Sequence, residues 1–458
     1  MTVIQNSKLK INPKLQAPNI KHGTRNYKHY YIMTYYQRST LFKKNRQKLA
    51  KTLQAGETAI VVANLNYPRN GDQFYPFRQD SDFFWLTGIN QDCSYLILHK
   101  DKTGLHENLL IKETSDKIRL WDGPRLNISE AKKISGIQNV YWLDKTKKLL
   151  KKYIEKSKII NINKSRRVNT DLKTAGDIFL EQYKSTLQLS DKTPGDICPR
   201  IHKLRVIKEP EEIEFIRKAI DITQHAYLSV LQQLKPEMTE YQAEAIMRYE
   251  MQTRGAGNMS FAPILASGEN ACILHYIKNN KTCKSGDLLL MDFGAEFNLY
   301  PADCSRTIPV NGKYTARQKL LYNAVLDVYN KAIKLFKPGE TINGINEKTG
   351  KLMEEKLLEL GLLTKESIKN ADKNTPAYKQ FFPHGTTHFI GLDVHDVGDK
   401  DMPFEPGMVM SCEPGIYIQN EGIGIRIETD VLITENGCED LMADFPVKVE
   451  DIENTMRT

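Results

Sequence analysis

The chain has 458 residues, of which 26% are charged and 40% hydrophobic, and it carries a formal net charge of +9 at pH 7. A chain of this length exceeds what one hydrophobic core usually organises, so we expect two or three domains. It contains no run of about 18 apolar residues, so the sequence argues against a membrane-spanning helix and a membrane partner.

The positive charge is concentrated at the amino terminus. Residues 1–50 hold eleven of the 65 Lys and Arg residues and no Asp or Glu, which leaves 54 basic and 56 acidic side chains in the rest of the chain. A nucleic-acid partner is therefore not indicated. The arm lacks the apolar segment of a secretory signal, and its Lys and Asn content differs from that of Arg- and Ser-rich transit peptides. We predict that residues 1–35 form a disordered basic extension.

The seven cysteines are odd in number and form no C-x-x-C pair. In a large body of nearly neutral charge, this usage is typical of reduced thiols and not of a disulfide framework. We therefore expect a cytoplasmic protein.

Strand and helix patterns alternate over residues 36–198, which indicates an α/β domain. We predict helices at 41–53 and 145–155, and strands at 58–64, 82–88, 93–100, 107–112 and 140–143. We expect four aromatic side chains to lie in the core, namely Phe83, Phe84, Trp85 and Trp121. The turn-rich segment 188–200 is interpreted as a linker.

Residues 199–458 predict an α+β domain in which helices cover one face of an antiparallel sheet. Pro210 suits the first turn of a long amphipathic helix at 208–234. Capping-box patterns at Thr239 and Thr315 begin two further helices. A fourth helix is expected at 343–360, and strand-like segments occupy 260–276, 287–310 and 407–434.

The segment 288–310 predicts a hairpin with two facing carboxylates. Asp292 and Asp303 are an odd number of residues apart, so a straight strand would point them to opposite faces. A turn near Phe297-Asn298 would instead place the two side chains opposite each other. Like charges opposed in an apolar sheet are destabilising unless a cation lies between them.

The segment 410–434 repeats this arrangement. A turn at Asn420-Glu421 would place Glu413 opposite Glu428. Arg426 lies two residues before Glu428, so it would share the same face and orient a neighbouring carboxylate.

Each hairpin alone is equally compatible with acidic side chains of an edge strand that face water. Two such hairpins, with the histidine-rich segment HGTTHFIGLDVHDVG at 384–398 shortly before the second, favour a metal site. Oxygen ligands with one imidazole suit Mn²⁺, Co²⁺ or Zn²⁺. Four carboxylates are more than one such ion usually needs, so we predict a dinuclear centre. This segment alone leaves open how many of its three histidines bind metal.

Three further segments belong to the same pattern, namely HYIKNN around His275, CEPGIYI and GIGIRIETD. Together with the residues above, they resemble the metallopeptidases of the pita-bread fold, and among them the aminopeptidase P family. RNGDQFYPFRQDSDFFWLTG and WDGPRL are similar to that family's creatinase-like N-terminal domain. The resemblance implies an α/β creatinase-like domain at 36–198. It also implies an α+β pita-bread domain at 199–458, with a curved antiparallel sheet covered by helices.

The resemblance further implies two divalent metal ions, with Mn²⁺ expected and Co²⁺ or Zn²⁺ as alternatives. The implied metal ligands are Asp292, Asp303, His388, Glu413 and Glu428, of which Asp303 and Glu428 bridge both ions. The implied catalytic residues are Glu413 for proton transfer, His275, His384 and His395 on the substrate side, and the orienting Arg426. A metal-bound hydroxide would attack the peptide bond before proline.

The activity that this resemblance implies is release of the N-terminal residue from peptides with proline at position two, by a homodimer or homotetramer. An Xaa-Pro dipeptidase (prolidase) is the alternative, because it shares the fold, the metals and most motifs. A methionine aminopeptidase is disfavoured by the large N-terminal domain. A metal-free creatinase-type enzyme and a non-catalytic pita-bread interaction module are disfavoured because all five ligand positions are filled.

Overall fold

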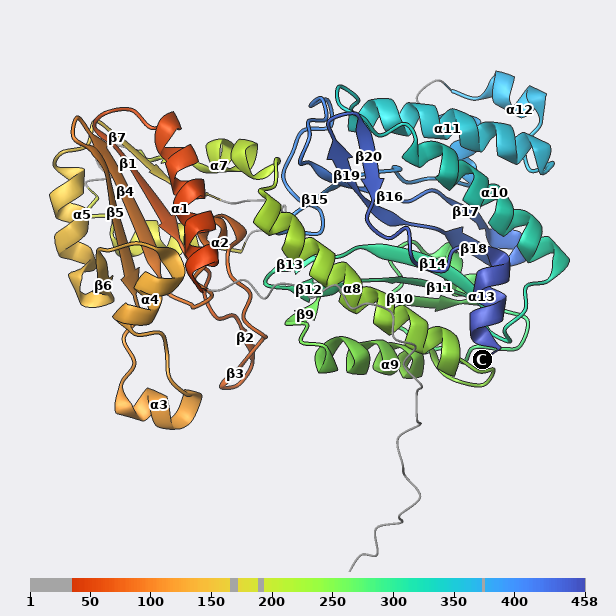
Figure 1. Ribbon diagram of the computed structural model, residues 1–458, viewed down its shortest axis with the longest axis horizontal. Helices are drawn as coiled ribbons and strands as arrows, with labels where there is room; N and C mark the ends of the chain where they lie inside the picture. The colour runs from red at the N-terminus through yellow and green to blue at the C-terminus, as the bar shows by residue number, and fades with distance from the viewer. Residues whose placement is uncertain (1–34, 165–171, 188–192, 373–374, 458) are drawn as a thin grey trace, which may run out of the picture. The chain divides into compact units, whose positions relative to one another are not determined.

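The computed structural model describes residues 35–164, 172–187, 193–372 and 375–457 (Figure 1). The predicted basic extension lies outside these residues apart from Tyr35, which begins the first helix. Within the described residues, no helix combines the length and the apolar character that crossing a bilayer requires.

The N-terminal half contains six helices and eight strands among its described residues. The helices are α1 (Tyr35–Thr52), α2 (Ser81–Thr87), α3 (Asp116–Asp122), α4 (Ile128–Ser135), α5 (Thr146–Ile154) and α6 (Ala175–Gln182). The strands are β1 (Glu57–Val62), β2 (Pro68–Asn70), β3 (Gln73–Phe74), β4 (Tyr95–Asp101), β5 (Gly104–Ile111), β6 (Val140–Trp142), β7 (Ile159–Ile162) and β8 (Gly195–Asp196).

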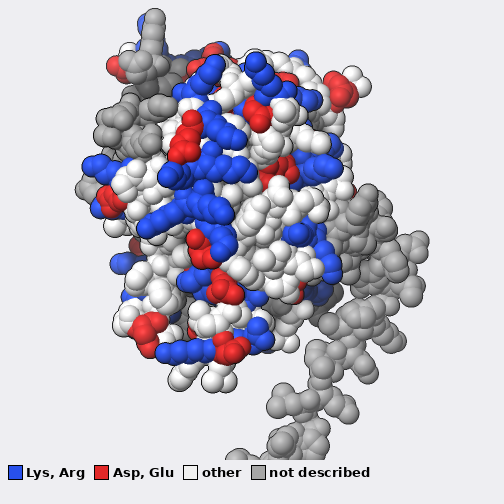
Figure 2. All heavy atoms as spheres, turned by 90° about the vertical axis from the view of Figure 1, so that its left-hand side faces the viewer, with Lys and Arg blue, Asp and Glu red and all other residues white. Residues whose placement is uncertain are grey.

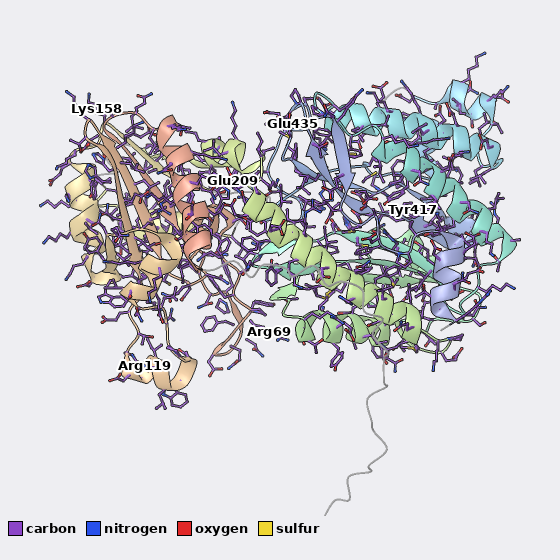
Figure 3. All side chains as sticks on the ribbon, viewed as in Figure 1. Arg69, Arg119, Lys158, Glu209, Tyr417 and Glu435 are labelled. Carbon is purple, nitrogen blue, oxygen red and sulfur yellow. The ribbon has the colours of Figure 1, made fainter. Side chains whose placement is uncertain are left out.

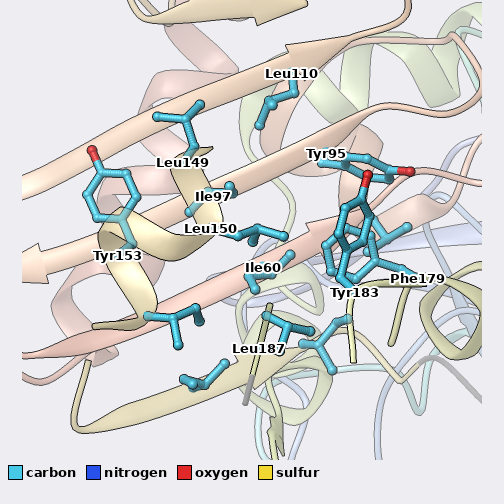
Figure 4. Packing of buried hydrophobic residues seen from close by; sticks show 14 residues of the cluster. Ile60, Tyr95, Ile97, Leu110, Leu149, Leu150, Tyr153, Phe179, Tyr183 and Leu187 are labelled. Atoms are coloured by element: carbon cyan, nitrogen blue, oxygen red, sulfur yellow. The ribbon is translucent and has the colours of Figure 1, made fainter. Parts of the chain in front are cut away.

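A six-stranded mixed sheet organises this half, in the order β6-β5-β4-β1-β7-β8. Strand β1 pairs antiparallel with β4 and parallel with β7. All six residues of β1 are buried, as expected for a strand covered by helices on both faces. On one face, Ile60 of the sheet shares a hydrophobic cluster with Leu150 of α5 and Phe179 of α6 (Figure 4). The predicted α/β class is therefore confirmed.

The strand predicted at 82–88 is wrong, because these residues form helix α2. The Asp80 side chain accepts a hydrogen bond from the Phe83 N–H and caps the helix, and Gly88 ends it in the left-handed region with φ 67°. Every residue of α2 is buried, so its sequence shows no helical periodicity and resembles a buried strand. The prediction that Phe83, Phe84 and Trp85 are core residues is confirmed.

Two further expectations for the N-terminal half are corrected. Trp121 is not a core residue, because it lies on the short helix α3 with 77% of its surface exposed. The predicted linker 188–200 contains ordered structure, since β8 adds to the edge of the sheet and Cys198 begins helix α7. Its first five residues, 188–192, lie outside the described part of the chain.

The second half follows with further helices and strands. The helices are α7 (Cys198–Arg205), α8 (Pro210–Gln233), α9 (Glu240–Thr253), α10 (Ala316–Ile333), α11 (Ile342–Glu359), α12 (Lys365–Asn370) and α13 (Val449–Met456). The strands are β9 (Asn258–Met259), β10 (Ile264–Ser267), β11 (Leu288–Phe293), β12 (Ala295–Phe297), β13 (Tyr300–Pro301), β14 (Cys304–Pro309), β15 (Phe389–Ile390), β16 (Val409–Cys412), β17 (Gly415–Ile418), β18 (Ile423–Arg426), β19 (Thr429–Thr434) and β20 (Gly437–Asp440).

Antiparallel sheets form the centre of this half. Strands β10, β11 and β14 make one sheet, and β15, β16, β19 and β20 make another. The hairpin β17–β18 contacts the first sheet through β11 and β14, while β14 also contacts β19. Helix α8 packs against β12 and β13, α9 against β9 and β10, and α10 against β16, β17 and β18 (Figure 1). The predicted α+β class and both predicted capping boxes are confirmed.

Basic side chains also gather within the folded part of the chain. Figure 2 shows a face of the molecule on which Lys and Arg outnumber Asp and Glu. Helix α5 contributes four exposed lysines and no acidic residue, namely Lys147, Lys148, Lys151 and Lys152. The nearly neutral charge of residues 51–458 therefore conceals a local basic surface.

Candidate active site

A cavity of about 550 Å³ lies in the second half of the chain. All nine predicted site residues line it, namely His275, Asp292, Asp303, His384, His388, His395, Glu413, Arg426 and Glu428. Apolar side chains such as Phe261, Leu274 and Ile277 form other parts of its wall. A concave, partly apolar site with converging polar groups is typical of ligand binding.

The first hairpin differs in register from the prediction. Asp292 pairs with Ser305 and not with Asp303, because the chain turns at Asn298-Leu299, one residue later than expected. Both turn residues have positive φ, 51° and 66°. The pairing is shifted by two residues, so Asp292 and Asp303 stay on one face and both reach the cavity.

The second hairpin has the predicted register. Cys412 pairs with Thr429 between β16 and β19, and Gly415 pairs with Arg426 between β17 and β18. Glu413 and Glu428 lie between these two pairs, and the shared register places them opposite each other, as predicted. The 3₁₀ turn Gln419–Glu421 followed by Gly422 at φ 62° closes the hairpin where it was expected.

The carboxylates are held where ionisation is unfavourable. Burial raises the pKa of Asp303 well above its ordinary value, and the charge of Asp292 raises it further. Burial also raises the pKa of Glu428, with Asp303 as its strongest charged neighbour. Burial also raises the pKa of Glu413, although the neighbouring His388 and Arg426 lower it. The cluster therefore favours added positive charge.

His388 is oriented toward these carboxylates. Its backbone N–H donates to Ser411 Oγ at 3.0 Å, which ties the residue to β16. The ring Nδ1 lies 3.1 Å from the Phe389 carbonyl oxygen. Nε2 lies 3.4 Å from Asp303 Oδ2 and 3.6 Å from Glu413 Oε1. If Nδ1 donates to the carbonyl, the Nε2 lone pair points into the carboxylate cluster, as metal ligation requires.

The other three histidines lie beside this cluster. Burial lowers the pKa of His384 to about 3, and its Nε2 lies 2.8 Å from Tyr417 Oη. Burial also lowers the pKa of His395 to about 4, and its ring packs edge-on against His388 with 4.5 Å between centroids. His275 is exposed at the cavity wall. The rings of half-buried His384 and exposed His395 are therefore both neutral at pH 7.

Arg426 contacts a neighbouring carboxylate as predicted, but sequence reasoning missed the hydroxyl residues Ser305 and Tyr417 that share its hydrogen bonds. Arg426 donates to Ser305 Oγ, Tyr417 Oη and Asp292 Oδ2 at 2.8, 2.8 and 2.6 Å. Ser305 in turn donates to Glu428 Oε2 at 2.7 Å. Tyr417, which lies within the second half (Figure 3), links Arg426 to His384. Hydroxyl residues in apolar strands carry no sequence signal of such a role.

Asp430 is a further missed acid. It is fully buried, and its Oδ2 accepts a hydrogen bond from the Asp303 backbone N–H at 3.2 Å. Its position two residues after Glu428 in an apolar strand, on the same face, was a usable signal.

The donor set fits divalent cations. One oxygen or nitrogen atom each of Asp303, His388 and Glu428 lies within 4.8 Å of the others. Asp292 Oδ1 is buried and has no hydrogen-bond partner among the described residues. A buried carboxylate oxygen without a donor is costly unless a cation satisfies it.

The sequence of the chain matches two family patterns. Residues 214–435 match metallopeptidase family M24, and residues 42–162 match the aminopeptidase P N-terminal domain. The Xaa-Pro aminopeptidase of Escherichia coli (strain K12) is 35% identical over 431 residues, which cover 91% of this chain and 97% of that protein. Xaa-Pro aminopeptidase 3 of Homo sapiens is 32% identical over 438 residues, covering 92% and 85% respectively.

Solved structures agree with the sequence matches. A structure described as an aminopeptidase P from Bacillus anthracis superposes with a TM-score of 0.86 at 35% identity, covering 92% of this chain and 98% of that chain. A zinc-substituted E. coli aminopeptidase P in complex with product gives a TM-score of 0.84 at 34% identity, with the same coverage.

Proposed function

Because the chain belongs to metallopeptidase family M24 and within it to the aminopeptidase P family, we propose that it is a metal-dependent Xaa-Pro aminopeptidase. It would release the N-terminal residue from peptides that have proline at position two. The observation that carries this proposal is the convergence of all nine predicted site residues on one cavity. We also propose domain limits of 36–198 and 199–458, because the N-terminal sheet ends with β8 and α7 begins at Cys198.

Two divalent cations are proposed in the cavity. Asp292 would hold one, His388 and Glu413 the other, and Asp303 and Glu428 both. A set of carboxylates with one imidazole suits Mn²⁺, with Co²⁺ or Zn²⁺ as alternatives. When bound, such ions lower the pKa of water and polarise a carbonyl group.

Side chains around the scissile bond would transfer the proton to the leaving nitrogen and stabilise the carbonyl oxygen. When the peptide bond breaks, the proline nitrogen, which carries no N–H in the peptide, must gain a proton to leave as a secondary amine. Glu413 is suited to move that proton, because its Oε atoms face the cavity between His388 and His384 and its pKa is raised by burial. His395 and His275 are proposed as hydrogen-bond donors to the carbonyl oxygen as it gains negative charge.

His384 is proposed to contact the peptide in one fixed orientation. Its Nδ1 lies 2.7 Å from the Gly385 carbonyl oxygen, to which it donates. Its Nε2 then accepts a hydrogen bond from Tyr417. Because the pKa of the ring is lowered to about 3, it presents a neutral surface to the substrate.

The test combines substrate choice with site variants. We expect a larger kcat/KM for Gly-Pro-X tripeptides than for the dipeptide Gly-Pro, whereas the reverse preference would identify a prolidase. Asp303→Ala and Glu428→Ala are each expected to abolish turnover after the protein has been resupplied with Mn²⁺. Substantial turnover by either variant would contradict the mechanism. A purified wild-type protein that neither binds a divalent ion nor is activated by one would favour a non-catalytic module.

We further propose a cytoplasmic homodimer or homotetramer. All seven cysteines are free, which supports a reducing compartment. A mitochondrial location is the alternative, since a relative 32% identical over 425 residues is named "Intermediate cleaving peptidase 55, mitochondrial" in Arabidopsis thaliana. Imaging of the full chain and of a chain without residues 1–33, each fused to a fluorescent protein, separates the two locations.

A further inference from the structure

The segment from Gly391 to Asp396 carries His395 into the cavity. It follows β15 and consists of bends without regular secondary structure. Two backbone hydrogen bonds close it, from Gly391 N–H to the Asp393 carbonyl at 3.1 Å and from Asp396 N–H to the Phe389 carbonyl at 2.9 Å. We call this segment the His395 loop. Its orientation therefore depends on what its side chains contact.

Two aspartates of the His395 loop contact the guanidinium of Arg205 in α7. Asp396 Oδ1 lies 2.7 Å from Arg205 Nη2, and Asp393 Oδ2 lies 3.3 Å from the same nitrogen. Lys208 Nζ lies 3.4 Å from the second oxygen of Asp396. The side chains of Arg205, Lys208 and Asp396 are each 1% exposed. At this depth a charge is tolerated only when it is paired, so losing one partner leaves the others strongly unfavourable.

Arg205 also reaches helix α2 of the N-terminal half. Its Nη1 lies 2.5 Å from Asp82 Oδ1, and the Asp82 side chain is fully buried. Ser81, the neighbouring residue, donates directly to Asp393 Oδ1 at 2.7 Å. One guanidinium therefore connects α2 to the loop that carries His395, and a hydroxyl of α2 makes a second connection.

The close packing at Gly391 confirms that Asp396 is held in a defined position. A Cβ atom on Gly391 would lie 1.9 Å from Asp396 Oδ2 and 3.0 Å from Lys208 Cε. The Asp396 carboxylate is folded back over the glycine, and no larger residue fits beneath it. The loop sequence is thus adapted to the ion pair with Arg205.

We propose that Arg205 is a positioning residue for His395. By pairing with Asp82 and Asp396 at once, it fixes the His395 loop against α2 and makes the orientation of the His395 ring depend on the N-terminal half. The inference rests on the proposed function, in which His395 contacts the substrate.

A double-mutant cycle tests whether Arg205 acts through His395. Arg205→Gln is expected to lower kcat/KM for a Gly-Pro-X tripeptide about 10- to 100-fold, because small misplacements of a site group have effects of this size. In a His395→Ala background, Arg205→Gln is expected to cause little further loss. Arg46→Gln is the matched control, since Arg46 is equally buried but hydrogen bonds to Glu107, Leu86 and Ser135. It is expected to lower the melting temperature and to leave kcat/KM unchanged well below that temperature.

Hydrogen exchange of the metal-free protein gives a readout independent of activity. Arg205→Gln is expected to speed exchange at the amides of Gly391 and Asp396, whereas Arg46→Gln leaves them unchanged. If Arg205→Gln does not fold, Arg205→Lys and Asp82→Asn serve in the same two measurements. If Arg205→Gln lowers kcat/KM by the same factor in the wild-type and His395→Ala backgrounds, the inference about Arg205 is wrong. It is also wrong if hydrogen exchange of the His395 loop is unchanged. In both cases the proposed function still stands. Full activity of His395→Ala would overturn the role proposed for His395 and the inference with it.

Discussion

Arg426 Nη2 lies 2.6 Å from Asp292 Oδ2, and this ion pair joins β18 to β11 behind the candidate metal centre. The guanidinium satisfies one oxygen of the carboxylate, while the other oxygen is buried without a hydrogen-bond partner in the described part of the chain. Arg426 is itself 4% exposed, so the pair is shielded from water. The arrangement leaves one buried oxygen of Asp292 that a bound cation would satisfy.

Arg426→Lys is therefore expected to weaken metal binding and activity together. Lysine keeps the charge, but its one ammonium nitrogen cannot reach Asp292, Ser305 and Tyr417, which Arg426 contacts through three separate nitrogens. Residues that orient metal ligands typically contribute about 10- to 100-fold to metal affinity or activity. Titration of metal-free protein with Mn²⁺ and measurement of kcat/KM check this expectation.

Arg317→Lys is the control for Arg426→Lys. Arg317 makes a comparable paired contact with Glu421, but both side chains are partly exposed to water. Its substitution is expected to change neither metal affinity nor kcat/KM, because surface ion pairs contribute about 0–1 kcal/mol. An Arg426→Lys enzyme that behaves like Arg317→Lys would show that the guanidinium does not orient Asp292.

Tyr417→Phe is expected to lower kcat/KM by up to about tenfold, the equivalent of one hydrogen bond. The hydroxyl donates to His384 Nε2 and accepts from Arg426, so its removal frees the imidazole to turn. Tyr322→Phe is a matched control, because its buried hydroxyl donates at 2.8 Å to the Val447 carbonyl oxygen. Both variants are expected to lose similar stability, measured by urea unfolding, while only Tyr417→Phe loses activity. Equal activities would contradict a role for Tyr417 in the site.

Metal removal is expected to make stability depend on pH in a defined direction. Burial and neighbouring charges raise the pKa of Asp303 and Glu428 in the folded protein. The unfolded carboxyl groups have pKa values near 4. Above that pH the folded state binds more protons than the unfolded state, so its stability falls as pH rises toward the folded pKa values. Divalent ions remove this penalty, and the melting-temperature gain on adding Mn²⁺ should grow with pH.

Ionisation of His384 and His395 changes stability with pH in the opposite direction to that of Asp303 and Glu428, so the measurement needs a control variant. Burial lowers the pKa of His384 to about 3 and of His395 to about 4, so these rings contribute stability that increases as pH rises toward their unfolded pKa near 6.5. An Asp303→Asn/Glu428→Gln variant keeps both histidines. The metal-free variant is expected to melt increasingly above the metal-free wild type as pH rises from 4. If the difference between the two melting temperatures does not change with pH, ionisation of Asp303 and Glu428 does not destabilise the metal-free protein as expected.

The hairpins show what sequence patterns predict well and where they fail. The carboxylate faces follow from strand alternation, and an error of two residues in the first register leaves every side chain on its predicted face. The turn itself was missed because Leu299 adopts φ 66°, a conformation that leucine rarely signals. Helix α2 was missed because a helix buried on all sides has no polar face, although Asp80 and Gly88 mark its two ends. Contacts such as Arg205 with Asp396 depend on tertiary structure and have no local signature.

Helix α3 presents two exposed apolar side chains from which we predict self-association of the chain. Leu120 and Trp121 are 81% and 77% exposed on this short helix. Adjacent large apolar side chains in water are costly and mark interaction surfaces. We expect the wild-type chain to sediment as a dimer or tetramer at micromolar concentration, and Leu120→Ser/Trp121→Ser to shift it toward smaller species. Tyr249→Ser on α9, where the side chain is 66% exposed without an apolar neighbour of this size beside it in sequence, is expected to leave assembly unchanged. A wild-type monomer, or equal assembly of the double variant, would show that α3 is not an interface.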